Sequence, residues 1–168
     1  MPFLHAPGFI QARTVDRSTP FPDVSQCTGL QLRVRTTITP PYTGFRFSFG
    51  NAHAPGGKLF AYGYKTDLRG VALEWSDIVL PFSAFTDFWD DATGDPIKTC
   101  QEDPQYCPDT RTLRNMKTMA IWAEGVAGRV DLEIKEIRAV GCYSDNEVKS
   151  AQDAVTMEEE ETRNVRRG

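Results

Sequence analysis

Two stretches in the first third of the chain alternate strictly between apolar and polar residues, and this period of two restricts the fold most. Residues 29–36 read GLQLRVRT and residues 44–50 read GFRFSFG. Successive side chains of a β-strand point to opposite faces, whereas a helix returns to the same face after 3.6 residues. Both stretches therefore predict half-buried strands. Their inner faces would carry Leu30, Leu32, Val34, Phe45, Phe47 and Phe49.

A third stretch, residues 129–140, begins with the same alternation, with Val130, Leu132 and Ile134 on its apolar face. The pattern then slips by one residue at Ile137, which predicts a β-bulge. Weaker strand patterns occupy residues 9–15, 59–65, 77–81 and 118–124. Residues 109–119 contain the best helix candidate, which is at most a short helix with Asp109 or Thr110 as its cap. Seven short strands with so little helix predict an all-β antiparallel β-sandwich or jelly roll.

The chain has 168 residues, which is enough for one domain. We expect the β-sandwich to occupy residues 1–142. Residues 143–168 form a charged tail with seven acidic and four basic residues and few apolar ones. Such a segment is typically disordered or weakly helical. The alternative is that the tail serves as an electrostatic docking arm for a partner.

Charge and motif content exclude several classes of function. The formal net charge is -4, and a nucleic-acid binder needs a surplus of cations, so no nucleic-acid partner is expected. The longest apolar runs are far too short for a transmembrane segment, and the start MPFLHAPGFIQ does not have the form of a signal peptide.

Catalytic signals are equally sparse. The histidines are His5 and His53, and no nucleophile motif, phosphate-binding glycine loop or zinc-histidine pair is visible. We therefore expect no catalytic residues, no cofactor, no metal and no enzymatic activity. A hydrolase would need two carboxylates across a cleft, and Asp131 and Glu133 share only a strand face. The acidic residues in the long loop 82–111 leave a calcium site open as an alternative to a solvated loop.

Four cysteines predict two disulfides. Cys100 and Cys107 are separated by a turn-like segment inside the long loop, and we expect them to pair. Cys27 precedes one predicted strand and Cys142 follows the last, so these two can meet at one end of a sandwich. Disulfides would indicate an oxidising compartment. A zinc site and free buried thiols are the alternatives.

A binding surface could be formed by exposed aromatic and arginine side chains. Aromatic rings stack on the apolar faces of sugars while polar neighbours bind the hydroxyl groups. The alternatives are core positions for the aromatic residues and solvated strand positions for the arginines. The arginines point outward from their strands, and we expect them to share one sheet face that contacts a partner together with the loop 86–111. The candidate binding residues are Arg33, Arg35, Arg46, Tyr62, Tyr64 and Trp122.

The order of several segments resembles the complex I intermediate-associated protein 30 family. The matching runs are GFIQARTV, CTGLQLRVR, GFRFSF, the segment from Trp75 to DIVLPFSAF, MAIWAEG and VDLEIKEIRAV. They extend over roughly residues 8–140. The family is similar to galactose-binding-like jelly rolls and to some carbohydrate-binding modules. Family domains begin with a further segment, so the sandwich is expected to lack one or two N-terminal edge strands.

The resemblance implies a non-enzymatic chaperone or assembly factor. It would bind protein subunits of a respiratory complex, complex I, or of a photosynthetic membrane complex during assembly, and it would work in the mitochondrion. The alternative on the same fold is a carbohydrate-binding module with a glycan partner. The alternative location is a plastid or a secretory compartment, because the predicted cysteine pairs suggest an oxidising space.

Overall fold

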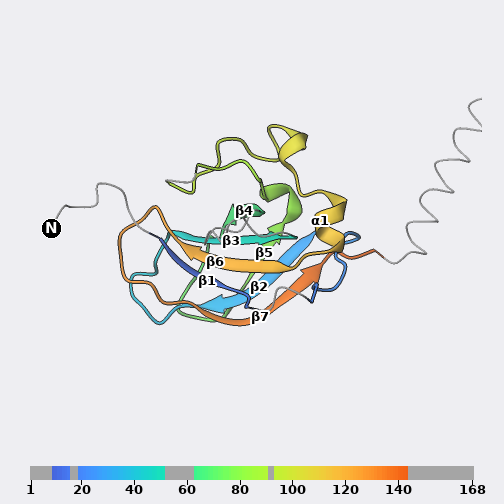
Figure 1. The fold of residues 1–168 in the computed structure, drawn as a ribbon. Coiled ribbons are helices and arrows are strands. Elements are labelled where there is room, and N and C mark those ends of the chain that lie inside the picture. Colours follow the sequence, from blue (N-terminus) through green and yellow to red (C-terminus); the bar gives the residue numbers. More distant parts are fainter. Residues whose placement is uncertain (1–8, 16–18, 52–62, 91–92, 144–168) are drawn as a thin grey trace, which may run out of the picture.

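The computed structural model describes residues 9–15, 19–51, 63–90 and 93–143, and within them the chain folds into two antiparallel sheets (Figure 1). Sheet A has the strand order β1-β6-β3-β4, and sheet B has the order β5-β2-β7. The strands are β1 (Ile10–Arg13), β2 (Gly29–Arg35), β3 (Phe45–Gly50), β4 (Tyr64–Asp67), β5 (Ser76–Pro81), β6 (Thr118–Ala123) and β7 (Glu133–Val140). The helical segments are η2 (Phe82–Ala84), η3 (Pro104–Tyr106) and α1 (Thr110–Arg114).

The two sheets pack face to face around one core. The alternating residues predicted for the inner faces of β2 and β3 are all almost completely buried, and Phe47 and Phe49 lie against Phe85 with ring centroids 6.2 and 4.8 Å away. Offset and edge-to-face contacts of this kind are favourable geometries for aromatic rings. Since strand side chains alternate, β3 presents its intervening residues, Arg46 and Ser48, to the outer face of sheet A.

The predicted fold class, an all-β antiparallel sandwich, is confirmed. The predicted bulge is also present, because the pairing of β7 with β2 shifts register between Arg33 and Val34. The expected short helix is α1, and the Asp109 side chain caps it by accepting a hydrogen bond from the Thr112 N–H. None of the helices in the described segments has the length or apolar character needed to cross a membrane.

Three expectations about strands need correction. The last strand begins at Glu133, so Val130 lies outside it and is exposed; Ile134 is on the strand but exposed. The reason is that β7 is an edge strand, whose apolar face is only partly covered. The strand expected at residues 59–65 lies at Tyr64–Asp67, and residues 59–62 fall outside the described residues. The predicted tail also lies outside them from residue 144 onward.

Both disulfides have the connectivity predicted from the sequence: Cys27 pairs with Cys142, and Cys100 pairs with Cys107. The first joins the segment before β2 to the segment after β7, at the end where β2 and β7 pair Gly29 with Val140. The second closes a turn in the long segment between β5 and β6. Two disulfides are typical of a protein that works in an oxidising compartment.

Candidate functional site

The outer face of sheet A carries a cluster of charged residues around Arg46. Arg46 is the cross-strand neighbour of Trp122 on β6 and of Asp67 on β4. Ser48, two residues further along β3, is the neighbour of Lys65. The strand register alone therefore places two cations, a carboxylate and an indole ring side by side on one face.

The Arg46 guanidinium is held by three carboxylates. Its Nε lies 3.2 Å from Asp67 Oδ1, its Nη2 lies 2.6 Å from Asp95 Oδ1, and its Nη1 lies 3.3 Å from Glu124 Oε1. Nη1 also donates a hydrogen bond to the Thr93 carbonyl, 3.1 Å away. The planar donor set of arginine suits such multiple contacts, and they leave the group little freedom to move.

Lys65 adds a second cation to the cluster. Its Nζ lies 2.9 Å from Glu124 Oε1 and faces two indole rings, with 4.3 Å to the Trp122 centroid and 4.9 Å to the Trp89 centroid. Trp122 in turn donates a hydrogen bond from Nε1 to Ser48 Oγ, 2.7 Å away. The charged groups at the centre of the cluster are therefore buried and mutually compensated, as buried charges must be.

The long segment after β5 lies across this face of the sheet. Thr86 pairs with Lys65 as an isolated antiparallel bridge, which extends sheet A beyond β4. Further along, Gly94 has a φ of +73°, and a Cβ at this position would meet the Arg46 guanidinium and the Glu124 carboxylate. Only glycine fits both this conformation and this close approach to the ion cluster.

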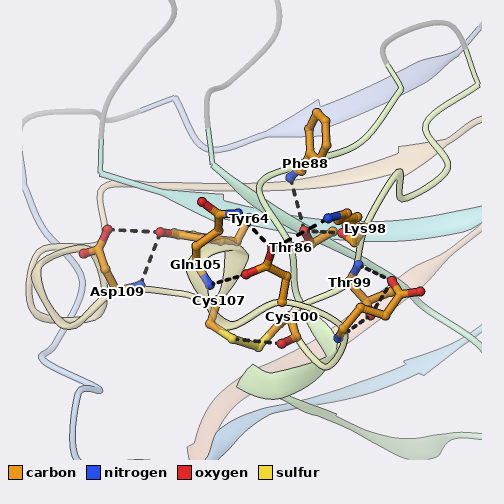
Figure 2. Close-up of a disulfide and its surroundings, with 11 residues drawn as sticks. Tyr64, Thr86, Phe88, Lys98, Thr99, Cys100, Gln105, Cys107 and Asp109 are labelled. Carbon is orange, nitrogen blue, oxygen red and sulfur yellow. Dashed lines mark hydrogen bonds and ion pairs between the residues drawn. A yellow bond between two sulfur atoms is a disulfide. The ribbon is translucent and has the colours of Figure 1, made fainter.

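The Cys100–Cys107 disulfide lies in the same segment, and Figure 2 shows its surroundings. Nearby, Thr86 donates from Oγ1 to the Lys98 carbonyl at 2.7 Å, which ties the two arms of the loop together. Tyr64 donates from its hydroxyl to Asp109 Oδ2 at 3.0 Å and accepts from the Asp109 N–H at 3.2 Å. The loop is thus anchored both to β4 and to the helix α1.

The pKa values of this anchoring pair shift in opposite directions. Burial raises the pKa of Tyr64 to about 12, since it disfavours the phenolate. Burial also acts to raise the pKa of Asp109, but hydrogen bonds from Thr112 and Tyr64 outweigh it and lower that pKa. The neutral phenol and the charged carboxylate are therefore the forms that the fold favours.

A groove runs beside the ion cluster. One pocket of about 570 Å³ and a second of about 230 Å³ share Arg46, Asp67 and Arg69 as lining residues, so they adjoin across the Arg46–Asp67 pair. We call the combined feature the Arg46 groove. Its residues with the chemistry most relevant to binding are Tyr42, Arg46, Asp67, Arg69, Trp89 and Asp95.

The groove offers fixed polar groups to a polar ligand. Asp95 and Asp67 remain partly exposed although both contact Arg46, and Arg69 binds Asp67 Oδ2 at 2.7 Å from a largely exposed position. Trp89 adds a half-buried ring at the other end. Carboxylates and guanidinium groups held in place in this way can form hydrogen bonds with ligand hydroxyls with little loss of side-chain entropy.

The structure does not bring the predicted arginines together. Arg46 lies on the outer face of sheet A, whereas Arg33 and Arg35 lie on the outer face of sheet B, so the prediction of one shared face is wrong. Alternation within each strand cannot say which sheet the strand joins. Arg33 binds Asp77 at 3.5 Å and Arg35 binds Glu133 at 2.8 Å, both as partly exposed pairs.

The predicted aromatic residues are also placed differently from an exposed sugar platform. Tyr64 is buried in the core against Phe49, with ring centroids 5.8 Å apart, and Trp122 is buried beneath Lys65 and Phe9. Tyr62 lies outside the described residues, as do His5 and His53. Among the described residues, no three His, Cys, Asp or Glu side chains gather in a way that could hold a metal ion.

Sequence reasoning missed most of the groove. Lys65 and Glu124 carried a usable signal, since each is a charged residue next to a buried one at the end of a predicted strand. Asp95 and Trp89 lie in the loop that was predicted to contact a partner, but no sequence signal placed them beside Arg46, because their position depends on how the long loop folds back over the sheet.

The comparisons with known proteins identify no family for this chain. No family model matches the chain, and no characterised protein matches it in sequence. A solved structure, described as "Solution structure, dynamics and binding studies of CtCBM11", a carbohydrate-binding module, aligns with a TM-score of 0.46 and 11% identity. The alignment covers 83% of this chain and 86% of that one.

Proposed function

We propose that this protein is a non-catalytic carbohydrate-binding module and that the Arg46 groove is its sugar site. The observation that carries the proposal is the convergence of Arg46, Asp67 and Asp95 on one groove, with each group held by ion pairs at 2.6–3.2 Å. Sugars present adjacent hydroxyl groups, and these are well matched by carboxylates and guanidinium groups in fixed positions.

The shape of the groove supports a chain of sugar units rather than a single one. Its two adjoining pockets extend from Trp89 and Pro96 at one end to Tyr42 and Val126 at the other. Trp89 provides a ring on which a pyranose can stack, while Asp95 lines the adjoining pocket. The partner is therefore a glycan, and the oxidising compartment indicated by the disulfides is a secretory or extracellular one.

A panel of soluble oligosaccharides and polysaccharides, titrated by calorimetry, tests the proposal. Trp89→Ala and Asp95→Asn should each weaken binding of the preferred sugar by about tenfold or more, because they remove a stacking surface or a hydroxyl acceptor. Trp75→Ala is the matched control, since Trp75 lies beside Arg35 on sheet B. Absence of binding to every sugar, or binding that is unaffected by both groove variants, would contradict the proposal.

A protein-binding role is the second candidate, and one observation favours it. On the outer face of sheet B, the Arg35 guanidinium lies 4.7 Å from the centroid of Trp75. Both side chains are partly exposed, and tryptophan and arginine are the residue types that dominate protein interfaces. This face would carry the assembly-factor function that the family resemblance implies.

The two candidates are separable by experiment. Capture of subunits of a respiratory or photosynthetic complex that persists in free sugar, is lost in Arg35→Glu and survives in Trp89→Ala would favour the second. Capture that free sugar abolishes, that is lost in Trp89→Ala and that survives in Arg35→Glu would favour the first. Arg35→Glu also reverses one charge of the Arg35–Glu133 pair, so its melting temperature must be compared with that of the unchanged protein.

A further inference from the structure

The edge of sheet B formed by β7 is open among the described residues. β7 pairs with β2 on one side, and no other described strand pairs with it on the opposite side. It is eight residues long, whereas the other edge strands, β1, β4 and β5, have four, four and six. Its exposed residues include Lys135, Glu136 and Arg138. A long edge with unpaired backbone groups is a template for pairing with another strand.

We propose that β7 pairs with β7 of a second copy of this chain, antiparallel and about a two-fold axis, so that two copies of sheet B become one continuous sheet. The inference does not depend on the sugar proposal, since β7 and the Arg46 groove belong to different sheets. A two-fold contact uses the same surface on both copies, so β7 must be complementary to itself.

The sequence of β7 meets this requirement. Residues 133–138 read EIKEIR. With the axis between Lys135 and Glu136, each of these two residues lies opposite the other in the second copy. In the same register Glu133 lies opposite Arg138, and Ile134 lies opposite Ile137. Every charge then meets its opposite, which is favourable for directly facing residues on neighbouring strands.

Neighbouring registers lack this complementarity. An axis through Lys135 would place the two lysines opposite each other, and an axis through Glu136 would do the same with two glutamates. Both shifts would also place Ile134 opposite a charged residue. Like charges directly opposite each other destabilise a sheet, so the charge pattern selects a single register.

The bulge is what makes this register possible. Residues three apart on a regular strand point to opposite faces. Here the bulge lets Ile134 pair with Val34 and Ile137 pair with Leu32, so that both isoleucines face the interior of the sandwich. A lysine and a bulge often protect an edge from pairing. In β7 they instead align the apolar and charged residues for a second copy.

An apolar pocket supports a partner at this edge. It has a volume of about 380 Å³ and lies between the two sheets, where Ile134 and Ile137 face Ala12, Met119 and Ile121. Ile134 remains 41% exposed. Pairing would place Ile137 of the second copy beside it and remove apolar surface from water, which is favourable.

Sedimentation equilibrium of the full chain under non-reducing conditions tests the inference. The unchanged protein should form dimers. Lys135→Glu and Glu136→Lys should each weaken dimerisation by about tenfold or more, because each places like charges opposite one another twice per dimer. Glu74→Lys is the matched control, because it makes the same change of charge at an exposed site outside β7 and should leave the dimer intact.

Two further arms make the test specific to the register. An equimolar mixture of the two single variants should form heterodimers, since every charge again meets its opposite, and the double variant should dimerise as the unchanged protein does. Circular dichroism spectra like that of the unchanged protein would show that the variants are folded. A chain that is monomeric at all concentrations, a dimer unaffected by both reversals, or failure of the mixture and the double variant to restore dimers would overturn the inference.

Discussion

Lys65 and Glu124 form a buried ion pair on the outer face of the sheet: Nζ lies 2.9 Å from Oε1, and the side chains are only 5% and 9% exposed. Arg46 contacts the same Glu124 oxygen. The Glu124 carboxylate therefore contacts both buried cations, while Asp67 and Asp95 supply further negative charge to Arg46. Burying charges is costly, so the arrangement holds only while both signs are present.

Glu124→Gln should strongly destabilise the fold. The substitution keeps the shape of the side chain but removes the negative charge that contacts the buried Lys65 and Arg46. Removal of one member of a buried ion pair costs about 3 kcal/mol or more. Chemical denaturation monitored by tryptophan fluorescence measures the loss. Asp77→Asn removes one member of the Arg33–Asp77 pair, whose side chains are both 42% exposed, and should cost less than about 1 kcal/mol. Equal losses would contradict the special role of Glu124.

Gly94→Ala should destabilise the protein more than Gly70→Ala does. Both glycines have positive φ angles, +73° and +86°, so alanine suffers similar backbone strain at either site. At Gly70 the added Cβ has only the Ile78 Cδ1 atom near it, at 4.0 Å, whereas at Gly94 it meets the Arg46–Glu124 pair. The difference between the two melting temperatures therefore isolates the contact with the ion cluster. Identical melting temperatures of the two variants would show that close packing of residue 94 against the Arg46–Glu124 pair does not affect stability.

Stability should fall in alkaline solution because of Tyr64. The folded state raises the pKa of this phenol to about 12, so its contribution is fully present below the ordinary pKa of about 10 and is lost as pH rises through 12. Denaturation experiments between about pH 9 and pH 11 should show a steeper fall for the unchanged protein than for Tyr64→Phe. At neutral pH the variant should lose about 1 kcal/mol, because Asp109 loses a hydrogen-bond donor. If stability falls with pH in the same way in both proteins, the contribution of Tyr64 and its raised pKa is contradicted.

The two disulfides should differ in their effect on stability. The Cys27–Cys142 bridge spans 115 residues and the Cys100–Cys107 bridge spans 7. On the chain-entropy model, closing the longer loop restricts the unfolded chain more, and removing that bridge should cost about 4–5 kcal/mol against about 2–3 kcal/mol for the shorter one. Thermal unfolding of the two paired Cys→Ser variants measures both losses of stability.

The shorter bridge should matter more for sugar binding, because it lies in the loop that lines the groove.

Local patterns were sufficient for most of the secondary structure. Alternation identified β2 and β3 with their inner faces, and the slip at Ile137 identified the bulge of β7. These features depend on neighbouring residues in the chain, since the pleat of a strand imposes its period of two wherever one face is buried. The exposed position of Ile134 could not be read in this way, because it depends on β7 being at the edge of its sheet.

Local sequence patterns were enough to predict two layers of strands with apolar inner faces and cysteines placed to pair. They did not predict that Arg46 joins Lys65 and Glu124 while Arg33 and Arg35 lie on the other sheet; this follows from how the strands pair. The physical reason is that period and burial are local properties of a strand. The neighbours of a charged side chain are set by which strands pair, in which register, and by where a long loop folds back over them.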